Sequence, residues 1–157
     1  MAYEFATIDA WIYQTLSEDA TLAGLLAVDN RPPDFQQGIY NMVAPEIDPI
    51  SRKQPAVPFI VFAAVSQSQE RAICGTSYRG INGYRVTLWD NDSGSVSATR
   101  AQTIMARVDT LLGDKTVTTT TPNLYCTRET ADQTYTLNDG GRTDIAVTAT
   151  YQIITRG

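Results

Sequence analysis

The side chains that could do chemistry are few, and their spacing matches no common catalytic set. The chain has no histidine, which excludes Ser-His-Asp triads, Cys-His pairs and imidazole metal ligands. Cys74 and Cys126 stand far apart, and neither belongs to a C-x-x-C pair, so zinc binding and thioredoxin-like redox chemistry are not supported. One disulfide between them is an alternative, but we expect two free thiols in a reducing cytoplasm.

The acidic and glycine motifs do not predict a binding site either. Asp90 and Asp92 before Gly94 resemble the start of a calcium loop. Such a loop needs an acid at its twelfth position, where Ala101 stands. The start of a helix, whose dipole favours nearby acids, explains them better. A phosphate-binding loop requires the pattern G-x-x-x-x-G-K-[ST], which the chain lacks.

The charge of the chain is acidic overall and unevenly placed. The net charge is −5 and the pI is about 4.6, which argues against broad binding to nucleic acid or anionic membrane. Residues 1–30 contain five acids and no base, and the rest of the chain is balanced. The bases are mostly arginine, a residue that favours interface ion pairs, although ordinary compositional bias is an equal alternative.

Two stretches have the apolar spacing of helices. In residues 4–28 one face carries Phe5, Ile8, Ile12 and Leu16, and Asp19 can cap a second set of turns. This pattern predicts either two helices with a bend or one kinked helix. The turn 90–95 leads into a second amphipathic helix, and we expect Gly113 to adopt the left-handed conformation at its end. Its apolar stripe consists of Ala101, Ile104, Met105, Val108, Leu111 and Leu112.

The remaining patterns predict strands. Residues 57–66 form a nearly continuous apolar run, which predicts a central strand covered on both faces. A polar hairpin loop follows at 67–77, and then a strand at 78–89, with Arg85, Thr87 and Trp89 on one face and Tyr84, Val86 and Leu88 on the other. Further expected strands span 38–42, 116–121, 124–129, 133–137 and 143–155. The last of these alternates, with the odd-numbered residues from Ile145 to Ile153 expected to point inward.

These elements predict an α+β fold, with a mostly antiparallel β-sheet, two main helices packed on one face, and extended loops and a hairpin. We expect residues 1–157 to form a single domain. The N-terminus lacks the features of a secretion signal, and the longest apolar run is too short to span a bilayer.

Two segments are candidate interaction sites because exposed loops on a rigid sheet concentrate binding residues. The first is the proline-rich segment 31–55, with Arg31, Phe35, Arg52 and Lys53. The second is the polar hairpin 66–79, and its candidate residues are Glu70, Arg71 and Arg79. For each segment, a plain surface loop is the alternative interpretation. We expect Trp11, Tyr13 and Trp89 to make core or subunit contacts rather than to stack on bases.

The order of elements resembles the tail-terminator (tail-completion, or tail-to-head joining) proteins of long-tailed bacteriophages. The resemblance spans nearly the whole chain and consists of element lengths and apolar positions rather than a catalytic signature. The residues that carry it are the opening helix ending in Asp19–Leu26, then Ile39–Asn41, Pro58–Phe62, Tyr84–Asp90, the helix Ala98–Leu112 and the strand Asp144–Ile154.

The resemblance implies a structural virion protein that forms a hexameric ring on the head-proximal end of the tail. Such a ring caps the tail tube, ends its polymerisation and offers a surface to the head connector. The implied partners are further copies of the chain, the major tail tube protein and the head-tail connector protein. DNA passes through the lumen without specific binding. The resemblance implies no enzyme activity, no cofactor, no membrane contact, and assembly in the bacterial host cytoplasm.

Two other functions remain open at this point. A different head-tail adaptor or neck protein would form a similar ring but bind a connector instead of tube ends. A small-ligand-binding α+β domain would need a deep apolar pocket with a few polar groups.

Overall fold

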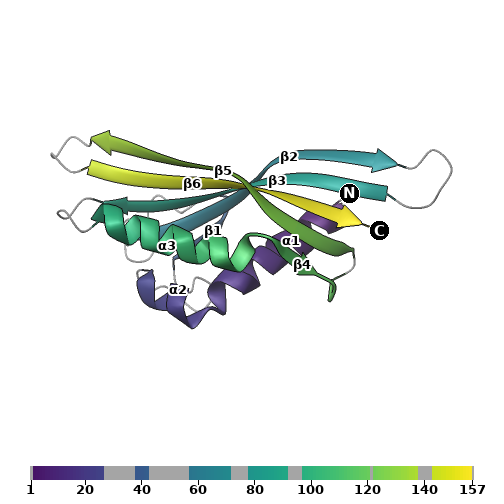
Figure 1. The fold of residues 1–157 in the computed structure, drawn as a ribbon, viewed down its shortest axis with the longest axis horizontal. Coiled ribbons are helices and arrows are strands. Elements are labelled where there is room, and N and C mark those ends of the chain that lie inside the picture. The colour runs from purple at the N-terminus through teal and green to yellow at the C-terminus, as the bar shows by residue number, and fades with distance from the viewer. Residues whose placement is uncertain are drawn as a thin grey trace, which may run out of the picture.

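The structure is a computed structural model, and it describes residues 2–26, 38–42, 57–71, 78–91, 97–120, 122–137 and 143–156. Helices cover one face of a mostly antiparallel sheet (Figure 1), which confirms the expected α+β class. The described helices are α1 (Ala2–Ser17), α2 (Ala20–Leu25) and α3 (Ser97–Leu112). The described strands are β1 (Ile39–Asn41), β2 (Phe59–Arg71), β3 (Tyr78–Asn91), β4 (Lys115–Val117), β5 (Asn123–Leu137) and β6 (Thr143–Arg156).

The sheet has the strand order β1-β2-β3-β6-β5-β4. All its neighbouring pairs are antiparallel except β1 and β2, which run parallel. The β2–β3 pair extends beyond the helices at one end of the long axis, and the end of β5 and the start of β6 lie at the other end, near the start of α3 (Figure 1). The helices therefore leave the β2–β3 end of the sheet uncovered.

Two helices rather than one kinked helix form the N-terminal segment. Asp19 lies between them in an extended conformation, and its carboxylate accepts a hydrogen bond of 2.7 Å from the Leu22 amide. This is the N-cap that the sequence predicted, and it satisfies one of the amides that a helix start leaves unpaired. The chain therefore turns at residues 18–19 and brings α2 against α3.

The core lies between the helices and one face of the sheet. α3 packs on β3, β5 and β6, and α1 packs on β1. The predicted alternation is confirmed in β6, where the odd-numbered residues from Ile145 to Ile153 are buried. Most of the predicted stripe of α3 is also buried, and Leu111 is partly buried against the same core. None of the described helices has the length and apolar character needed to cross a bilayer.

The prediction that residues 57–66 are covered on both faces is wrong. Ile60 and Phe62 are fully buried, but the opposite face of β2 remains accessible, and Val65 is 46% exposed. The helices lie only on the first face (Figure 1). The predicted hairpin loop at 67–77 is also shorter than expected, because β2 continues to Arg71 and β3 begins at Tyr78.

Several local predictions also differ from the structure. Gly113 does not take the left-handed conformation; Asp114, with φ of 52°, does. Asp90 belongs to β3 rather than to the turn before α3. The expected strand at 116–121 spans only Lys115–Val117, and the strands at 124–129 and 133–137 form one strand with a bulge between Arg128 and Thr130. A β-bulge lets a long strand change its facing without ending.

Candidate functional site: an uncovered apolar sheet face

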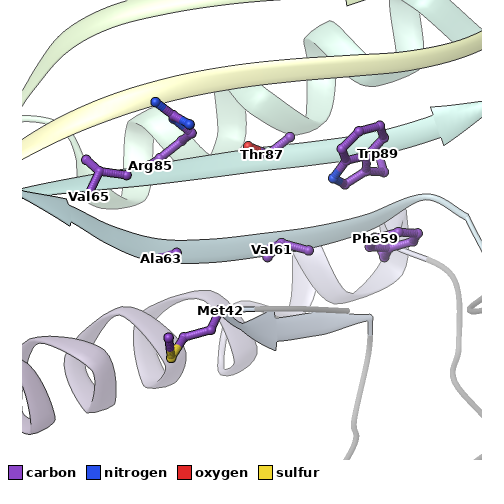
Figure 2. Close-up of a pocket in the computed structure, with 8 residues that line it drawn as sticks. All are labelled: Met42, Phe59, Val61, Ala63, Val65, Arg85, Thr87 and Trp89. Carbon is purple, nitrogen blue, oxygen red and sulfur yellow. The ribbon is translucent and has the colours of Figure 1, made fainter. Parts of the chain in front are cut away.

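The main candidate site is a groove on the sheet face that the helices leave uncovered. We call it the open-face groove. It has a volume of about 400 Å³, and Figure 2 shows its side chains on neighbouring strands. It is lined by Met42, Phe59, Val61, Ala63, Val65, Arg85, Thr87 and Trp89. Most of these side chains are apolar, and Arg85 is the one charged group among them.

Strand register brings the groove together. Phe59 lies opposite Trp89, and Val61 lies opposite Thr87. Directly opposed side chains in antiparallel strands lie on the same face, so the pairs form two neighbouring rows (Figure 2). The sequence alternation correctly placed Thr87 and Trp89 on one face of β3. The polar Thr87 is paired with β6, where its hydroxyl lies 3.3 Å from that of Thr148.

A β-bulge in β2 marks the end of the groove that lies farthest from Phe59 and Trp89. The register of β2 and β3 shifts between Ala64 and Ser66, which leaves Val65 unpaired. Gly83 lies opposite this bulge, and a side chain there would collide with the Ser66 hydroxyl. After the bulge the even-numbered residues lie on the face that the odd-numbered residues occupied before it, so the polar Ser66 and Ser68 follow the apolar residues of the groove.

Met42 is the most exposed large apolar residue of the groove. Its side chain is 71% exposed, and its backbone has φ of 68°. A left-handed conformation costs a residue with a side chain about 1–2 kcal/mol. A hydrogen bond of 2.8 Å from the Met42 amide to the Phe62 carbonyl holds this turn against β2. Strained backbone of this kind is common at functional sites.

The sequence-predicted site residues fall into two groups. Arg31, Phe35, Arg52 and Lys53 lie outside the described residues. Glu70 and Arg79 lie opposite each other on β2 and β3, with an ion pair of 3.8 Å, and both side chains are well exposed. Arg71 is the last residue of β2. These residues belong to paired strands rather than to the exposed loop that the sequence indicated, and an exposed ion pair contributes little to stability.

The acids of the N-terminal segment are partly engaged within the chain. Asp9 accepts hydrogen bonds from the Tyr84 hydroxyl at 2.8 Å and from the Asn41 amide at 3.0 Å. Asp19 forms an ion pair with Arg107 of α3. That guanidinium, together with the Leu22 amide, holds the pKa of the Asp19 carboxyl below its ordinary value. These contacts join α1 and α2 to the sheet and to α3.

Buried polar groups on the helix side serve the fold rather than a reaction. The carboxylate of Asp90 is fully buried and binds Arg100 through two hydrogen bonds. Tyr151 is buried and donates to Asp109, and burial raises the pKa of its hydroxyl. Cys126 is a buried free thiol whose pKa is raised by burial to about 12, so it is unsuited to nucleophilic chemistry. The described residues hold no cluster of side chains suited to a metal ion.

The sequence did not indicate Met42, Phe59 and Val61 as site residues. The signal for Phe59 and Val61 was present in the apolar run of 57–66, which has two apolar faces, whereas the predicted helices cover only one. The combination predicts one uncovered apolar face. Large exposed apolar surfaces on proteins commonly mark binding sites.

Comparison with known proteins gives one informative result. No protein family and no curated protein matches the sequence. The fold is similar to that of a chain in the solved virion of a native gene transfer agent particle, with a TM-score of 0.62 and 16% identity. The similar region covers 97% of this chain and 96% of that chain. At this identity the similarity establishes a shared fold.

Proposed function

We propose that this chain is a structural protein of a phage-like virion, where it terminates the tail. A hexameric ring of subunits caps the finished tail tube, stops its polymerisation and offers a surface to the head connector. The observation that carries the proposal is the fold similarity to a virion chain over 97% of this chain and 96% of the other. A match of that extent indicates one common architecture rather than a shared small motif. The tail-terminator resemblance of the sequence supplies the specific role.

The open-face groove supports a role in assembly. Trp89 is 39% exposed and lies beside Phe59, Val61 and Met42. Aromatic residues and methionine are enriched in the cores of protein interfaces, and a few such residues carry most of the binding energy. We assign the groove to the contact with a neighbouring virion protein, either the tail tube or the connector.

The proposed role involves surfaces and no reaction, so we assign neither an enzyme activity nor a cofactor to the chain. The ring lies at the head-proximal end of the tail after assembly in the bacterial cytoplasm. DNA passes through its lumen without being read. The acidic net charge of −5 is compatible with this passage, because strong binding to DNA requires many basic contacts with phosphates.

Deletion of the gene in a particle-producing strain tests the role. A tail terminator predicts tubes of uncontrolled length that carry no heads, as seen by electron microscopy. Tubes of normal length that fail to join heads would instead indicate a head-tail adaptor. Normal joined particles would refute both roles.

Complementation of the deletion tests the groove. Trp89→Ala removes an aromatic side chain from the groove, and truncation of an aromatic residue that acts as an interface hot spot costs about 2 kcal/mol or more, roughly a 30-fold loss of affinity. Tyr125→Ala is the matched control, because Tyr125 is 44% exposed but lies outside the groove. We expect only the Trp89 variant to lose joined particles; equal activity of the two would exclude the groove as a contact.

A further inference from the structure

Two strands of the sheet have long outer edges. β1 pairs with β2 only at residues 60–62, and β4 pairs with β5 only at residues 124–126. Within the part of the chain that the structure describes, no strand pairs with the outer edge of residues 63–71 or of residues 127–137. These edges present main-chain amides and carbonyls, and such an edge is a template for another strand.

The two edges lie on opposite sides of the sheet and at opposite ends of it. β2 and β5 flank the central pair β3 and β6. The end of β2 lies near one end of the long axis, and the end of β5 lies near the other (Figure 1). One copy can therefore offer its β5 edge to the β2 edge of a second copy while its own β2 edge stays available to a third.

Strand direction favours this pairing. β2, β3, β6 and β5 alternate in direction, so β2 and β5 run opposite to each other. When copies follow one another around an axis with the same orientation, the β5 of one copy lies antiparallel to the β2 of the next. Antiparallel pairing is slightly more stable per residue than parallel pairing. A heterologous contact of this kind closes into a ring when the rotation between copies permits it.

Hydrogen-bond alternation identifies the main-chain groups that point outward. The Ile60 amide donates to the Gly38 carbonyl, and the Phe62 carbonyl accepts from the Met42 amide, at the two ends of β1. Before the bulge, the main-chain groups of the even-numbered residues of β2 therefore point outward, away from β3. Residues of a strand bond alternately to either side, and the register shift at the bulge reverses the numbering. Gln67 and Gln69 therefore point outward on β2, whereas Ser68 points toward β3.

The register gives the equivalent residues of β5. β3 and β6 pair without interruption, and β5 follows β6 with one bulge before Thr130. The direction of the main-chain amides alternates along β5, and the register with β6 places the amides of Thr130 and Thr134 toward β6. The amide of Ala131 therefore points away from β6 toward the outer edge, as the amide of Gln69 does on β2.

Proline and lysine, two residues that commonly prevent edge pairing, are absent from both edges. Natural edge strands are protected by proline, by charged residues and lysine above all, by bulges or by short length, and the charged residues of these two edges are arginine and acids. Residues 63–71 and 127–137 contain no proline and no lysine, and both segments are longer than a typical strand. Each contains a bulge near its start and then runs on in regular register.

We infer that copies of this chain join head to tail, the β5 edge of one copy pairing antiparallel with the β2 edge of the next. The inference deepens the proposed ring by naming the surface that joins its subunits, and in that respect it rests on the proposed function. The sheets of neighbouring subunits then form one continuous sheet, and every subunit uses two different edges. The open-face groove remains accessible for the contact with another virion protein.

Two proline variants test the pairing, each blocking one edge. Proline is tolerated on edge strands where its missing amide would face solvent, so Gln69→Pro and Ala131→Pro should keep the fold. Each removes one donor and places its ring against the incoming strand, which should weaken association at least about tenfold. Ser68→Pro and Thr134→Pro are the matched controls, because they remove amides used inside the sheet and should lower the unfolding temperature.

Sedimentation velocity of the full chain provides the measurement, at the highest soluble concentration and with purified tail tubes. We expect the wild type to assemble, each edge variant alone to remain monomeric, and an equimolar mixture of the two to stop at a dimer. The dimer is specific to head-to-tail pairing, because each variant retains the one edge that the other lacks. If a proline variant fails to fold, Gln67→Lys/Gln69→Lys replaces Gln69→Pro, and Ala131→Lys replaces Ala131→Pro.

Several outcomes would overturn the inference. They are a monomeric wild type under both conditions, unchanged assembly of either folded edge variant, or a mixture that remains monomeric. The deletion phenotype is read separately from tail length. If the deletion strain makes normal joined tails while the mixed edge variants form the expected dimer, the proposed function is refuted and the edge pairing stands. If the deletion strain makes tails of uncontrolled length while the edge variants assemble like the wild type, the edge pairing is refuted and the proposed function stands.

Discussion

The left-handed backbone of Met42 gives a prediction that separates stability from assembly. Met42→Gly and Met42→Ala both remove the exposed side chain, but only glycine adopts φ of 68° without steric cost. The left-handed conformation costs an L-residue about 1–2 kcal/mol, and glycine avoids this cost. Glycine also loses more backbone entropy on folding than alanine, which reduces its advantage by about 0.5–1 kcal/mol. We therefore expect the glycine variant to be more stable than the alanine variant, by roughly 0.75 kcal/mol at the middle of these ranges.

Urea unfolding of the two variants at neutral pH measures this difference. Because the side chain of Met42 is 71% exposed, its removal costs little buried surface in either variant. Inside an ordinary strand or helix, glycine is instead less stable than alanine by roughly 0.5–1 kcal/mol, so the sign of the difference decides the question. An alanine variant more stable than the glycine variant would refute the left-handed conformation.

The same two variants test the role of the groove. Both lose the thioether side chain, so the proposed function predicts that both form fewer joined particles, and to a similar extent. A defect only in the less stable variant would show that stability, and not the lost contact, limits assembly.

Three further predictions concern the charged and buried groups. Arg100→Met removes the guanidinium that binds the buried Asp90 carboxylate and should reduce the free energy of unfolding by about 2 kcal/mol, less than for a fully buried pair because the guanidinium is 36% exposed. Adding Asp90→Asn should restore part of this loss of stability, and a double variant with no recovery would contradict the lost ion pair as the cause. In a Cys74→Ser background, Cys126 should resist alkylation at pH 8 until the protein unfolds, because burial raises the pKa of its thiol to about 12; rapid labelling of the native protein would contradict its burial. Asp19→Asn should be less stable than the wild type at neutral pH, and this difference in stability should shrink as the pH falls below the ordinary carboxyl pKa of 3.8. The reason is that a carboxyl group with a lowered pKa stabilises the fold only while it is ionised. A stability difference that does not depend on pH would exclude the ion pair as its cause.

Local patterns correctly predicted most elements. The break between α1 and α2 at Asp19, the buried stripe of α3 and the alternation of β6 follow from short-range spacing. These features depend on interactions within a few residues of the chain, which the sequence shows directly. The exact position of the left-handed residue after α3 was missed, because Asp114 rather than the neighbouring glycine takes it.

The candidate site was only partly predictable. The sequence placed Thr87 and Trp89 on one face but assigned residues 57–66 to a strand with both faces covered. A strand with apolar residues on both faces has the same sequence pattern whether both faces are covered within the chain or one face is left for another molecule to cover. The sequence likewise placed Glu70 in a loop, because polar residues after a bulge look like the end of a strand.

Composition and local periodicity are sufficient to predict the α+β class, the helix start at Asp19 and the exclusion of histidine-dependent chemistry. The sheet face that the helices leave open, and the strand edges that lack a partner among the described residues, become visible only in the folded chain. Both depend on where distant segments pack: the helices cover one face only, and β1 and β4 are too short to cover the edges of β2 and β5. The resulting groove and edges are the surfaces on which the proposed assembly rests.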